Sequence, residues 1–248
     1  MLINTISVVI IAKNAELTIE ETLQSLNLFK NVLLYLNDST DQTEDLSKKY
    51  NNVTITQGDF LGFGPTKNQA ATYAENDWIL SLDSDEVVSD VLLEELKVLK
   101  LENKKEVFIL KRDNYFLGKE VKYSGWGKDK LTRLYNKTYH QFNQNMVHEF
   151  VALENDTVKT ELQNSFKHNA VQDINQFLQK VMKYSDLAAK DKKTCHFLVV
   201  VLKAQFAFFK TYVLQLGFLD GWRGFVIAIS NFNGKFFRYT KRYINCQK

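Results

Sequence analysis

Four short apolar runs, each followed by a segment of helical character, constrain the fold of this chain more than any other feature. The runs span residues 6–12, 31–37, 52–56 and 77–82. The first, Ile-Ser-Val-Val-Ile-Ile-Ala, is rich in β-branched residues, as expected of a strand covered on both faces. The helical segments span residues 16–26, 41–50, 65–74 and 87–101. This alternation predicts an α/β fold with parallel strands and helices on both faces of the sheet.

The pattern changes after residue 101. Three further strand-like segments follow, at residues 106–115, 131–135 and 147–153. Polar loops separate them. Helical spacing returns in residues 172–193 and continues, with breaks, through residues 197–243.

These patterns divide the chain into two expected parts. Residues 1–170 form the sheet domain, with one half over residues 1–101 and a second half over residues 102–170. Residues 171–248 form a helical extension with amphipathic spacing. A chain of 248 residues is long enough for one large domain with such an appendage.

The chain has only two cysteines, Cys195 and Cys246. Two are too few for a disulfide framework, and no CxxC pair is present that could bind zinc. We therefore expect reduced thiols in a cytosolic compartment.

No targeting or membrane-spanning segment is expected. Residues 1–5 lack the basic region of a signal peptide. The most apolar window, residues 197–218, contains Lys203 and Lys210 as well as two glutamines. A spanning helix needs about 20 residues that are almost free of charge, so we expect this window to remain outside the membrane core.

The acidic triplet Asp83-Ser84-Asp85 follows the fourth predicted strand directly. In open parallel sheets, ligands bind beyond the carboxyl ends of the strands. Two carboxylates there suit Mg²⁺ or Mn²⁺, which typically sit between a carboxylate and substrate phosphates. The alternative is an acidic helix N-terminus, because Asp and Glu favour that end of the helix dipole.

Three more polar segments are expected at the same edge of the sheet. They are residues 12–16 after the first strand, residues 37–41 after the second, and residues 62–68 before the helix that leads to the fourth. Asn14, Ser39 and Thr40 could instead be helix caps, and Lys67 could be a solvated lysine. Together the segments bring amides, a lysine and carboxylates around one crevice, which fits a nucleotide diphosphate.

The order of these segments resembles family 2 glycosyltransferases. The matching stretches are ISVVIIAKN at residues 6–14, DSTDQT at 38–43, GFGPTKN at 62–68 and DWILSLDSDE at 77–86. Later motifs are similar to the branch that contains lipopolysaccharide-core β-1,4-glucosyltransferases. These are GWGKD at residues 125–129 with RLY at 133–135, VHE at 147–149 and GFLDG at 217–221.

The resemblance implies a GT-A-type, Rossmann-like nucleotide-sugar-binding fold with a mixed sheet flanked by helices, and a reaction that inverts the anomeric carbon. It implies a divalent cation, Mn²⁺ or Mg²⁺, on Asp83 and Asp85, with His148 as a candidate third ligand. The donor of that branch is UDP-glucose. The residues that the resemblance assigns to the donor are Ile11, Lys13, Asn14, Asn37, Lys67, Asp83, Ser84 and Asp85.

The chain departs from the family at three positions. Leu36 stands where the second strand usually ends in Asp, and Ala15 replaces a Glu that often follows the first strand. Asn37 occupies a position that contacts uracil in some relatives. Because Asn can also bond a base edge, the base preference stays open.

Two carboxylates compete for the role of general base, which takes the proton of the acceptor hydroxyl. Asp129 matches the position of the family's catalytic carboxylate, four residues before Arg133, and Glu149 is its rival. Asp129 could instead form a loop salt bridge with a neighbouring lysine, Lys128 or Lys130. Trp126 could stack on the acceptor sugar or pack in the core.

The C-terminal quarter predicts an anionic partner. Residues 190–248 carry eleven Lys and Arg against two Asp, a net charge of +9, in a chain whose net charge is +3. The same residues include 13 aromatics, many of them on helical stripes with Leu and Val. This arrangement favours an anionic membrane surface over nucleic acid. We therefore expect a peripheral protein on the cytoplasmic face of the cytoplasmic membrane, acting on a lipid-linked saccharide such as the lipopolysaccharide inner core.

Two alternatives belong to other classes. A nucleotidyltransferase uses a similar sheet and cation, but residues 12–16 lack the glycine-rich first loop that it needs. A non-catalytic membrane or nucleic-acid binding module would explain the basic tail. The ordered acidic crevice argues against that module, as does the lack of an RNA-binding aromatic motif.

Overall fold

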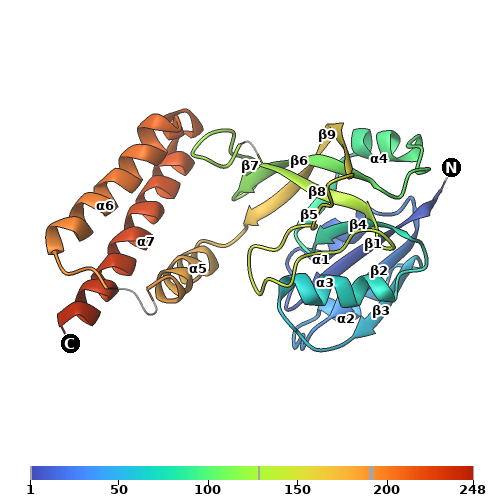
Figure 1. The fold of residues 1–248 in the computed structure, drawn as a ribbon, viewed down its shortest axis with the longest axis horizontal. Helices are drawn as coiled ribbons and strands as arrows, with labels where there is room; N and C mark the ends of the chain where they lie inside the picture. Colours follow the sequence, from blue (N-terminus) through green and yellow to red (C-terminus); the bar gives the residue numbers. More distant parts are fainter. Residues whose placement is uncertain (1, 128, 190–192, 248) are drawn as a thin grey trace. The chain divides into compact units, whose positions relative to one another are not determined.

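The computed structural model describes residues 2–127, 129–189 and 193–247. The chain forms two compact units. The sheet unit comprises Met1–Arg112 and Asp129–His168, and the helical unit comprises Asp113–Lys128 and Asn169–Lys248. The sheet unit ends at His168, close to the expected boundary at residue 170, but residues 113–128 belong to the helical unit rather than to the second half of the sheet domain (Figure 1).

A mixed sheet organises the first unit. The strands are β1 (Ile3–Ala12), β2 (Phe29–Leu36), β3 (Val53–Gln57), β4 (Trp78–Asp83), β5 (Glu86–Val88), β6 (Glu106–Phe116), β7 (Lys119–Glu120), β8 (Asp129–Asn136) and β9 (Val158–Val171). Their order is β3-β2-β1-β4-β8-β6-β9-β5, with β7 beside β6. Strand β7 and the last residues of β6 and β9 belong to the helical unit. Strands β1 to β4 are parallel, whereas β8 runs antiparallel to β4 and to β6. The α/β class and the mixed sheet expected from the sequence are confirmed.

Helices cover both faces of the parallel strands. They are α1 (Ile19–Gln24), α2 (Thr43–Ser47), α3 (Phe63–Thr72) and α4 (Asp90–Lys97). Alternate residues of β1 enter different cores: Val8 and Ile10 pack with α1 and α4, whereas Val9 and Ile11 pack with α3. Burial on both faces explains why the sequence of this strand is apolar throughout.

Two strand expectations need correction. Residues 147–153 form no strand, and Val151 makes only an isolated bridge with Phe142. Strand β9, which the sequence did not suggest, lies at residues 158–171. Its polar residues are explained by its position, because most of its side chains are exposed or only partly buried.

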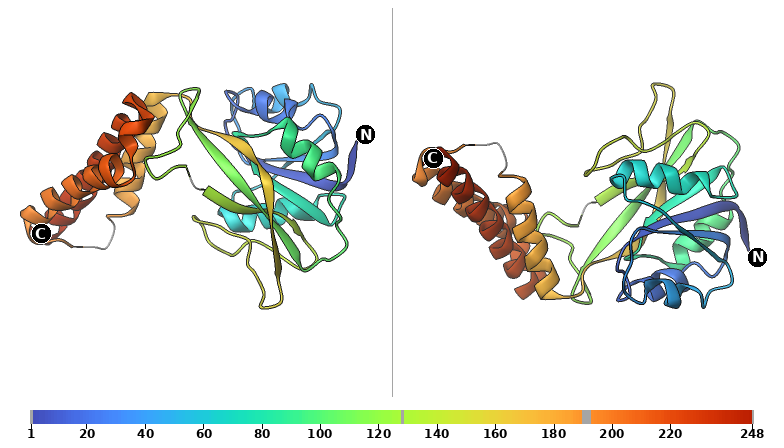
Figure 2. Two further views of the ribbon diagram at one scale, coloured as in Figure 1. Left: turned by 90° about the horizontal axis from the view of Figure 1, so that it is seen from above. Right: turned by 90° about the horizontal axis from the view of Figure 1, so that it is seen from below.

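The helical unit is built on a helix hairpin. Its elements are α5 (Ile174–Leu187), α6 (Phe197–Phe209), the π-helix η1 (Lys210–Leu214), the 3₁₀-helix η2 (Gly217–Asp220) and α7 (Trp222–Gln247). Helices α6 and α7 lie along each other, and α5 packs on α7 (Figure 2). The helical C-terminal extension expected from the sequence is confirmed.

Cys195 and Cys246 form a disulfide, which overturns the expectation of free thiols. The cysteines lie just before α6 and at the end of α7, so the helix hairpin brings them together, with 5.4 Å between their Cα atoms. Two cysteines are too few for a framework but enough to close one hairpin.

By length and composition, α6 with η1 is apolar enough to cross a membrane, contrary to the expectation drawn from its two lysines. The segment spans Phe197–Leu214, and only 17% of it is buried inside the protein. A helix of this length and exposure presents a large apolar face that the helical unit itself does not cover.

Two basic residues of α7 serve the structure of the helical unit. Lys241 Nζ lies 2.6 Å from the Asp186 carboxylate of α5. Arg242 is 7% exposed and donates a hydrogen bond to the carbonyl oxygen of Ala188. These two charges therefore attach α5 to α7. The net charge of the tail had instead suggested that they face an anionic partner.

We predict that Leu80→Ala lowers the free energy of unfolding by about 2–5 kcal/mol, because it leaves a cavity in a close-packed core. Leu80 is fully buried in β4. The control is Val91→Ala, since Val91 is 60% exposed on α4 and should change stability by no more than about 0.5 kcal/mol. Denaturant unfolding monitored by circular dichroism measures both values. Equal stability of the two variants would contradict the position assigned to β4.

Candidate functional site

The loops after β1 and β2 interlock at the carboxyl edge of the sheet. The amide of Asn14 donates to Ser39 Oγ at 3.1 Å, and Asn14 Oδ1 accepts from the amide of Thr40 at 2.8 Å. Asn14 and Asp38 both have φ of 52°, in the left-handed region that Asn and Asp tolerate best among residues with a side chain. None of the three polar residues suggested as helix caps acts as one. They fix one loop to the other instead.

Asp41 continues this connection. One carboxylate oxygen accepts from the amide of Glu16 at 3.0 Å, and the other accepts from the hydroxyl and the amide of Thr43. Burial would raise the pKa of Asp41, but the hydrogen bonds from Thr43 and Glu16 hold it below its usual value. The Asp-Ser-Thr-Asp motif is thus a structural connector whose last carboxylate stays ionised.

A cavity of about 290 Å³ opens beside these loops, at the ends of β2 and β3. Its lining residues are Leu36, Asp38, Ser39, Glu44, Gln57, Gly58 and Asp59. Asn37 and Ile11 are buried next to this edge, and Lys13 is exposed, with its Nζ 3.6 Å from the Asp38 carboxylate. The predicted donor residues of β1 and β2 therefore lie at one edge, but Leu36 and Asp38 line the cavity rather than Asn37.

Asp83, at the end of β4, is held by two cations. Its Oδ1 lies 2.8 Å from Lys67 Nζ of α3, and its Oδ2 lies 2.8 Å from the guanidinium of Arg133 on β8. Both cations are almost fully buried, with side-chain exposures of 1% and 6%. Burial would raise the pKa of Asp83, but the charges of Arg133 and Lys67 hold it well below its usual range.

The ion pairs continue from Arg133 to the first candidate base. Arg133 also bonds Glu86, which is fully buried, and Glu86 lies 3.4 Å from Arg112 of β6. Arg112 in turn lies 2.8 Å from the carboxylate of Asp129. Burial is the main influence that raises the pKa of Glu86, and the nearby carboxylates of Asp83 and Asp85 raise it further.

A second branch leads from Lys67 to Glu149, the rival base. Lys67 Nζ lies 2.9 Å from the Glu149 carboxylate. Asp129 and Glu149 are therefore the two ends of one chain of ion pairs that passes through Asp83. The side chain of Asp129 is 36% exposed, whereas that of Glu149 is 18% exposed.

The Gly-Phe-Gly-Pro-Thr-Lys-Asn segment docks the loop that carries Glu149. The amide group of Asn68 exchanges two hydrogen bonds with the backbone of Phe142, at 2.7 and 2.8 Å. The amides of Phe63 and Gly64 donate to the carbonyls of Met146 and Asn145. A Cβ on Gly64 would lie 2.0 Å from the carbonyl oxygen of Asn143, so only glycine permits this approach. This segment therefore positions the loop. The backbone amides at the N-terminus of α3 are already bonded to carbonyls of that loop.

Asp85 is the acidic residue best placed to accept a cation. Among the described residues, its carboxylate has one ionic neighbour, His168 of β9, at 3.6 Å. Because both oxygens of Asp83 are bonded to cations, Asp85 is the member of the triplet with free coordination capacity. Oxygen ligands of this kind fit Mg²⁺ or Mn²⁺ held jointly with substrate phosphates.

His148 does not complete a metal site in this arrangement. It is exposed, with φ of 60°, on the loop that precedes Glu149. Within the described ranges, no group of three or more His, Cys, Asp or Glu side chains is placed to hold a metal ion. Among the described residues the protein alone therefore offers no such cluster, and the role of His148 as a third ligand stays a prediction.

Sequence reasoning missed three members of the ion-pair chain: Glu86, Arg112 and Arg133. Arg133 was noted only as part of a motif, although its spacing of four from Asp129 places both on one face of β8. Arg112 lies directly opposite Asp129 in the β6–β8 ladder, which no sequence pattern revealed. Lys130, a suggested partner of Asp129, pairs with Glu161 instead, and the other suggestion, Lys128, lies outside the described residues.

The two later glycine motifs meet in the helical unit. Asp220 accepts hydrogen bonds from the amides of Lys122 and Tyr123 and from the Ser124 hydroxyl. Trp126 is half-buried, and its ring lies 6.1 Å from that of Phe116. This ring belongs to an aromatic cluster, so core packing accounts for part of its role.

The matching family model and the curated relatives both point to glycosyltransferases. Residues 7–155 match the family described as Glycosyl transferase family 2. An uncharacterized glycosyltransferase of Rickettsia prowazekii is 28% identical over 256 residues, which cover 95% of this chain and 86% of that protein. An uncharacterized glycosyltransferase of Rickettsia typhi shows the same identity and coverage.

Two solved structures align with parts of this chain at low sequence identity. Residues 1–349 of S. aureus TarS, in complex with UDP, align with a TM-score of 0.48 and 17% identity, over 92% of this chain and 80% of that one. The glucosyl-3-phosphoglycerate synthase of Mycobacterium tuberculosis, solved with Mn²⁺ and UDP, aligns with a TM-score of 0.35 and 22% identity, over 45% and 44%.

The family match covers more than half of the chain and includes the whole acidic edge of the sheet. It begins in β1 and extends past Glu149, so it contains Lys67, Asp83 and Asp129. This chain belongs to glycosyl transferase family 2.

Proposed function

We propose that the protein is an inverting, metal-dependent hexosyltransferase that moves glucose from UDP-glucose to a lipid-linked saccharide. The observation that carries the proposal is the chain of ion pairs that joins both candidate bases to Asp83 at the carboxyl edge of the parallel strands. Family membership favours this activity over nucleotidyl transfer and over a non-catalytic binding module.

The donor is proposed to bind along the edge from β3 to β4. The cavity at the ends of β2 and β3 has the polar lining that a nucleoside requires, and Asp85 lies beyond the end of β4. Because Lys67 is fully engaged by Asp83 and Glu149, we assign it to holding these carboxylates rather than to a phosphate. The choice of UDP-glucose rests on the resemblance to the glucosyltransferase branch.

A divalent cation bound at Asp85 would neutralise the diphosphate leaving group. Asp83, whose two carboxylate oxygens are paired with Lys67 and Arg133, is not free to coordinate this cation. The protein's own role here is to hold Asp85 in position and to keep Asp83 paired with Lys67 and Arg133.

Asp129 is the proposed general base. Its side chain is twice as exposed as that of Glu149, so an acceptor hydroxyl can approach it more readily. Its partner Arg112 holds the carboxylate in place through an ion pair. Glu149 already has a structural task, because it joins its loop to the buried Lys67.

The proposed acceptor is linked to a membrane lipid, as in the inner core of lipopolysaccharide. The support is the exposed apolar face of the helical unit. Its residues include Leu198, Leu202, Phe209, Leu214, Leu219 and Trp222, each of which is at least 48% exposed. We propose that this face lies in the interface on the cytoplasmic side of the membrane.

Asp85→Asn is expected to abolish transfer, because the neutral amide cannot hold the cation against the diphosphate. Donor binding should also become insensitive to Mn²⁺ or Mg²⁺. Release of nucleotide diphosphate and calorimetric donor titration, each with and without metal, measure these effects. Asp77→Asn, at the opposite end of β4, is the control and should behave like the wild type. Wild-type turnover of Asp85→Asn with an unchanged metal requirement would refute this cation site.

Asp129→Asn should lower kcat by about 10²–10⁴-fold while donor affinity stays the same, as expected for loss of a general base. Glu149→Gln is the paired variant and should mainly lower stability, because it leaves Lys67 with one partner fewer. Single-turnover rates and thermal unfolding separate the two effects. If Glu149→Gln gives the larger loss of rate at equal stability, the base is Glu149.

Leu198→Glu combined with Leu202→Glu should abolish binding to vesicles that contain phosphatidylglycerol, because the charges lie on the apolar face. The matched control is Val91→Glu with Val98→Glu on α4, whose side chains are 60% and 79% exposed. Vesicle sedimentation measures binding. Equal binding of both double variants would contradict the proposed membrane face.

A membrane extraction distinguishes surface binding from a span. We expect alkaline, high-salt washing to release the wild-type protein from membranes, because a helix in the interface is held reversibly. Retention after this wash would show that α6 crosses the membrane instead.

A further inference from the structure

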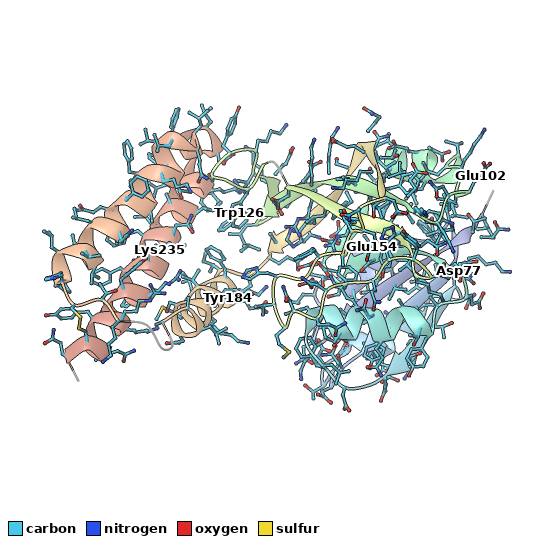
Figure 3. All side chains as sticks on the ribbon, viewed as in Figure 1. Asp77, Glu102, Trp126, Glu154, Tyr184 and Lys235 are labelled. Atoms are coloured by element: carbon cyan, nitrogen blue, oxygen red, sulfur yellow. A yellow bond between two sulfur atoms is a disulfide. The ribbon has the colours of Figure 1, made fainter. Side chains whose placement is uncertain are left out.

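A second cavity, of about 450 Å³, lies within the helical unit. It is formed by α6, η1, α7 and the loop around Trp126 (Trp126 and Lys235 are labelled in Figure 3). Its lining residues are Ser124, Gly125, Trp126, Lys203, Phe206, Ala207, Lys210, Thr211, Gln215, Asn231, Lys235 and Tyr239. Its volume lies in the range of sites that bind small molecules.

The charge of this cavity is positive. Lys203, Lys210 and Lys235 line it, and no carboxylate is among the lining residues. Within the described part of the chain, none of the three lysines forms an ion pair, whereas Lys241 on the same helix hairpin does. The three lysines are exposed and line one opening together without a carboxylate, so the local charge is positive and favours an anionic ligand.

The cavity has a fixed frame. Ser124 and Gly125 have φ of 59° and 82°, and the amide of Ser124 donates to the carbonyl of Gln215 at 3.0 Å. The positive φ of Gly125 favours glycine at this position, because residues with a side chain rarely adopt it. Asp220 holds the Ser124 hydroxyl at 2.7 Å. The two glycine motifs of the second half of the sequence thus build one wall.

The opposite wall contains an irregular helix. Lys210 and Thr211 begin the π-helix, a distortion that is frequent at functional sites. The buried Thr211 accepts a hydrogen bond from Asn231 of α7 at 2.9 Å, which joins the two helices at the cavity. A hydrogen bond thus joins η1 to α7 at the cavity, and the three lysines lie on α6, η1 and α7.

The neutral lining suits a saccharide. Gln215 and Asn231 supply amide groups, which can bond sugar hydroxyls. Trp126, Phe206 and Tyr239 supply aromatic surface, against which the apolar face of a sugar ring can pack. Lysine is a common phosphate ligand because it acts as a point charge, whereas flat carboxylates are better matched by arginine.

We propose that this cavity binds a phosphorylated saccharide, with the phosphate among Lys203, Lys210 and Lys235 and the sugar ring beside the aromatic side chains. The assignment of this saccharide to the acceptor rests on the proposed transferase function. The cavity then selects acceptors that carry a phosphate, whereas the donor binds at the edge of the sheet.

The test is calorimetric titration with glucose 6-phosphate, without donor, metal or membrane. The wild type should bind it saturably, and glucose should bind at least about tenfold more weakly, since it lacks the charged hydrogen bonds. The triple variant Lys203→Gln, Lys210→Gln and Lys235→Gln should lose at least about tenfold in affinity, whereas arginine at the same positions should retain it. Lys100→Gln, Lys104→Gln and Lys159→Gln change the net charge equally on the sheet unit and should have no effect.

Glycerol 1-phosphate is titrated in parallel, because a phospholipid headgroup carries the same phosphate chemistry. Tighter binding of glucose 6-phosphate supports the saccharide. Binding of glycerol 1-phosphate alone would assign the phosphate to a lipid headgroup and overturn the proposal. Absence of saturable binding, or equal loss in both triple glutamine variants, would also overturn it. Since no turnover is measured, these outcomes are independent of the proposed transferase reaction, which the Asp85 and Asp129 variants test.

Discussion

The buried ammonium group of Lys67 is the constraint on which the rest of the site depends. It is 1% exposed, and a charge withdrawn from water to that extent must be paired. Its partners come from β4 and from the loop after β8: Asp83 and Glu149. The loop must therefore close on α3, and Asp83 must remain ionised, before the fold can hold this lysine. A geometry useful for catalysis is thus maintained by an electrostatic requirement of folding.

The parallel half of the sheet could be predicted because its signals are local. Buried parallel strands are apolar throughout, as residues 6–12 illustrate, and their carboxyl ends must meet at one edge. The position of Asp83 and Asp85 follows from this alone. The polar strand β9 could not be predicted in the same way, because its partly buried faces produce no clear alternation.

The partners of the charged residues could not be predicted, because they come from elements that are distant in the sequence. Arg112 lies opposite Asp129 only if β6 and β8 pair antiparallel in one register. Lys241 and Asp186 meet only because α5 packs on α7. Composition shows that the tail is basic, but it does not show which of its Lys and Arg side chains form ion pairs within the fold.

The helical unit is assembled from two separate stretches of chain, and this has a consequence for how such a protein can evolve. Residues 113–128 are anchored by Asp220 and by Arg223, which donates to the carbonyls of Phe116 and Leu117. A gene truncated after residue 170 would still encode the first stretch but none of its anchors. Loss or exchange of the C-terminal helices alone would therefore leave residues 113–128 without the side chains that hold them.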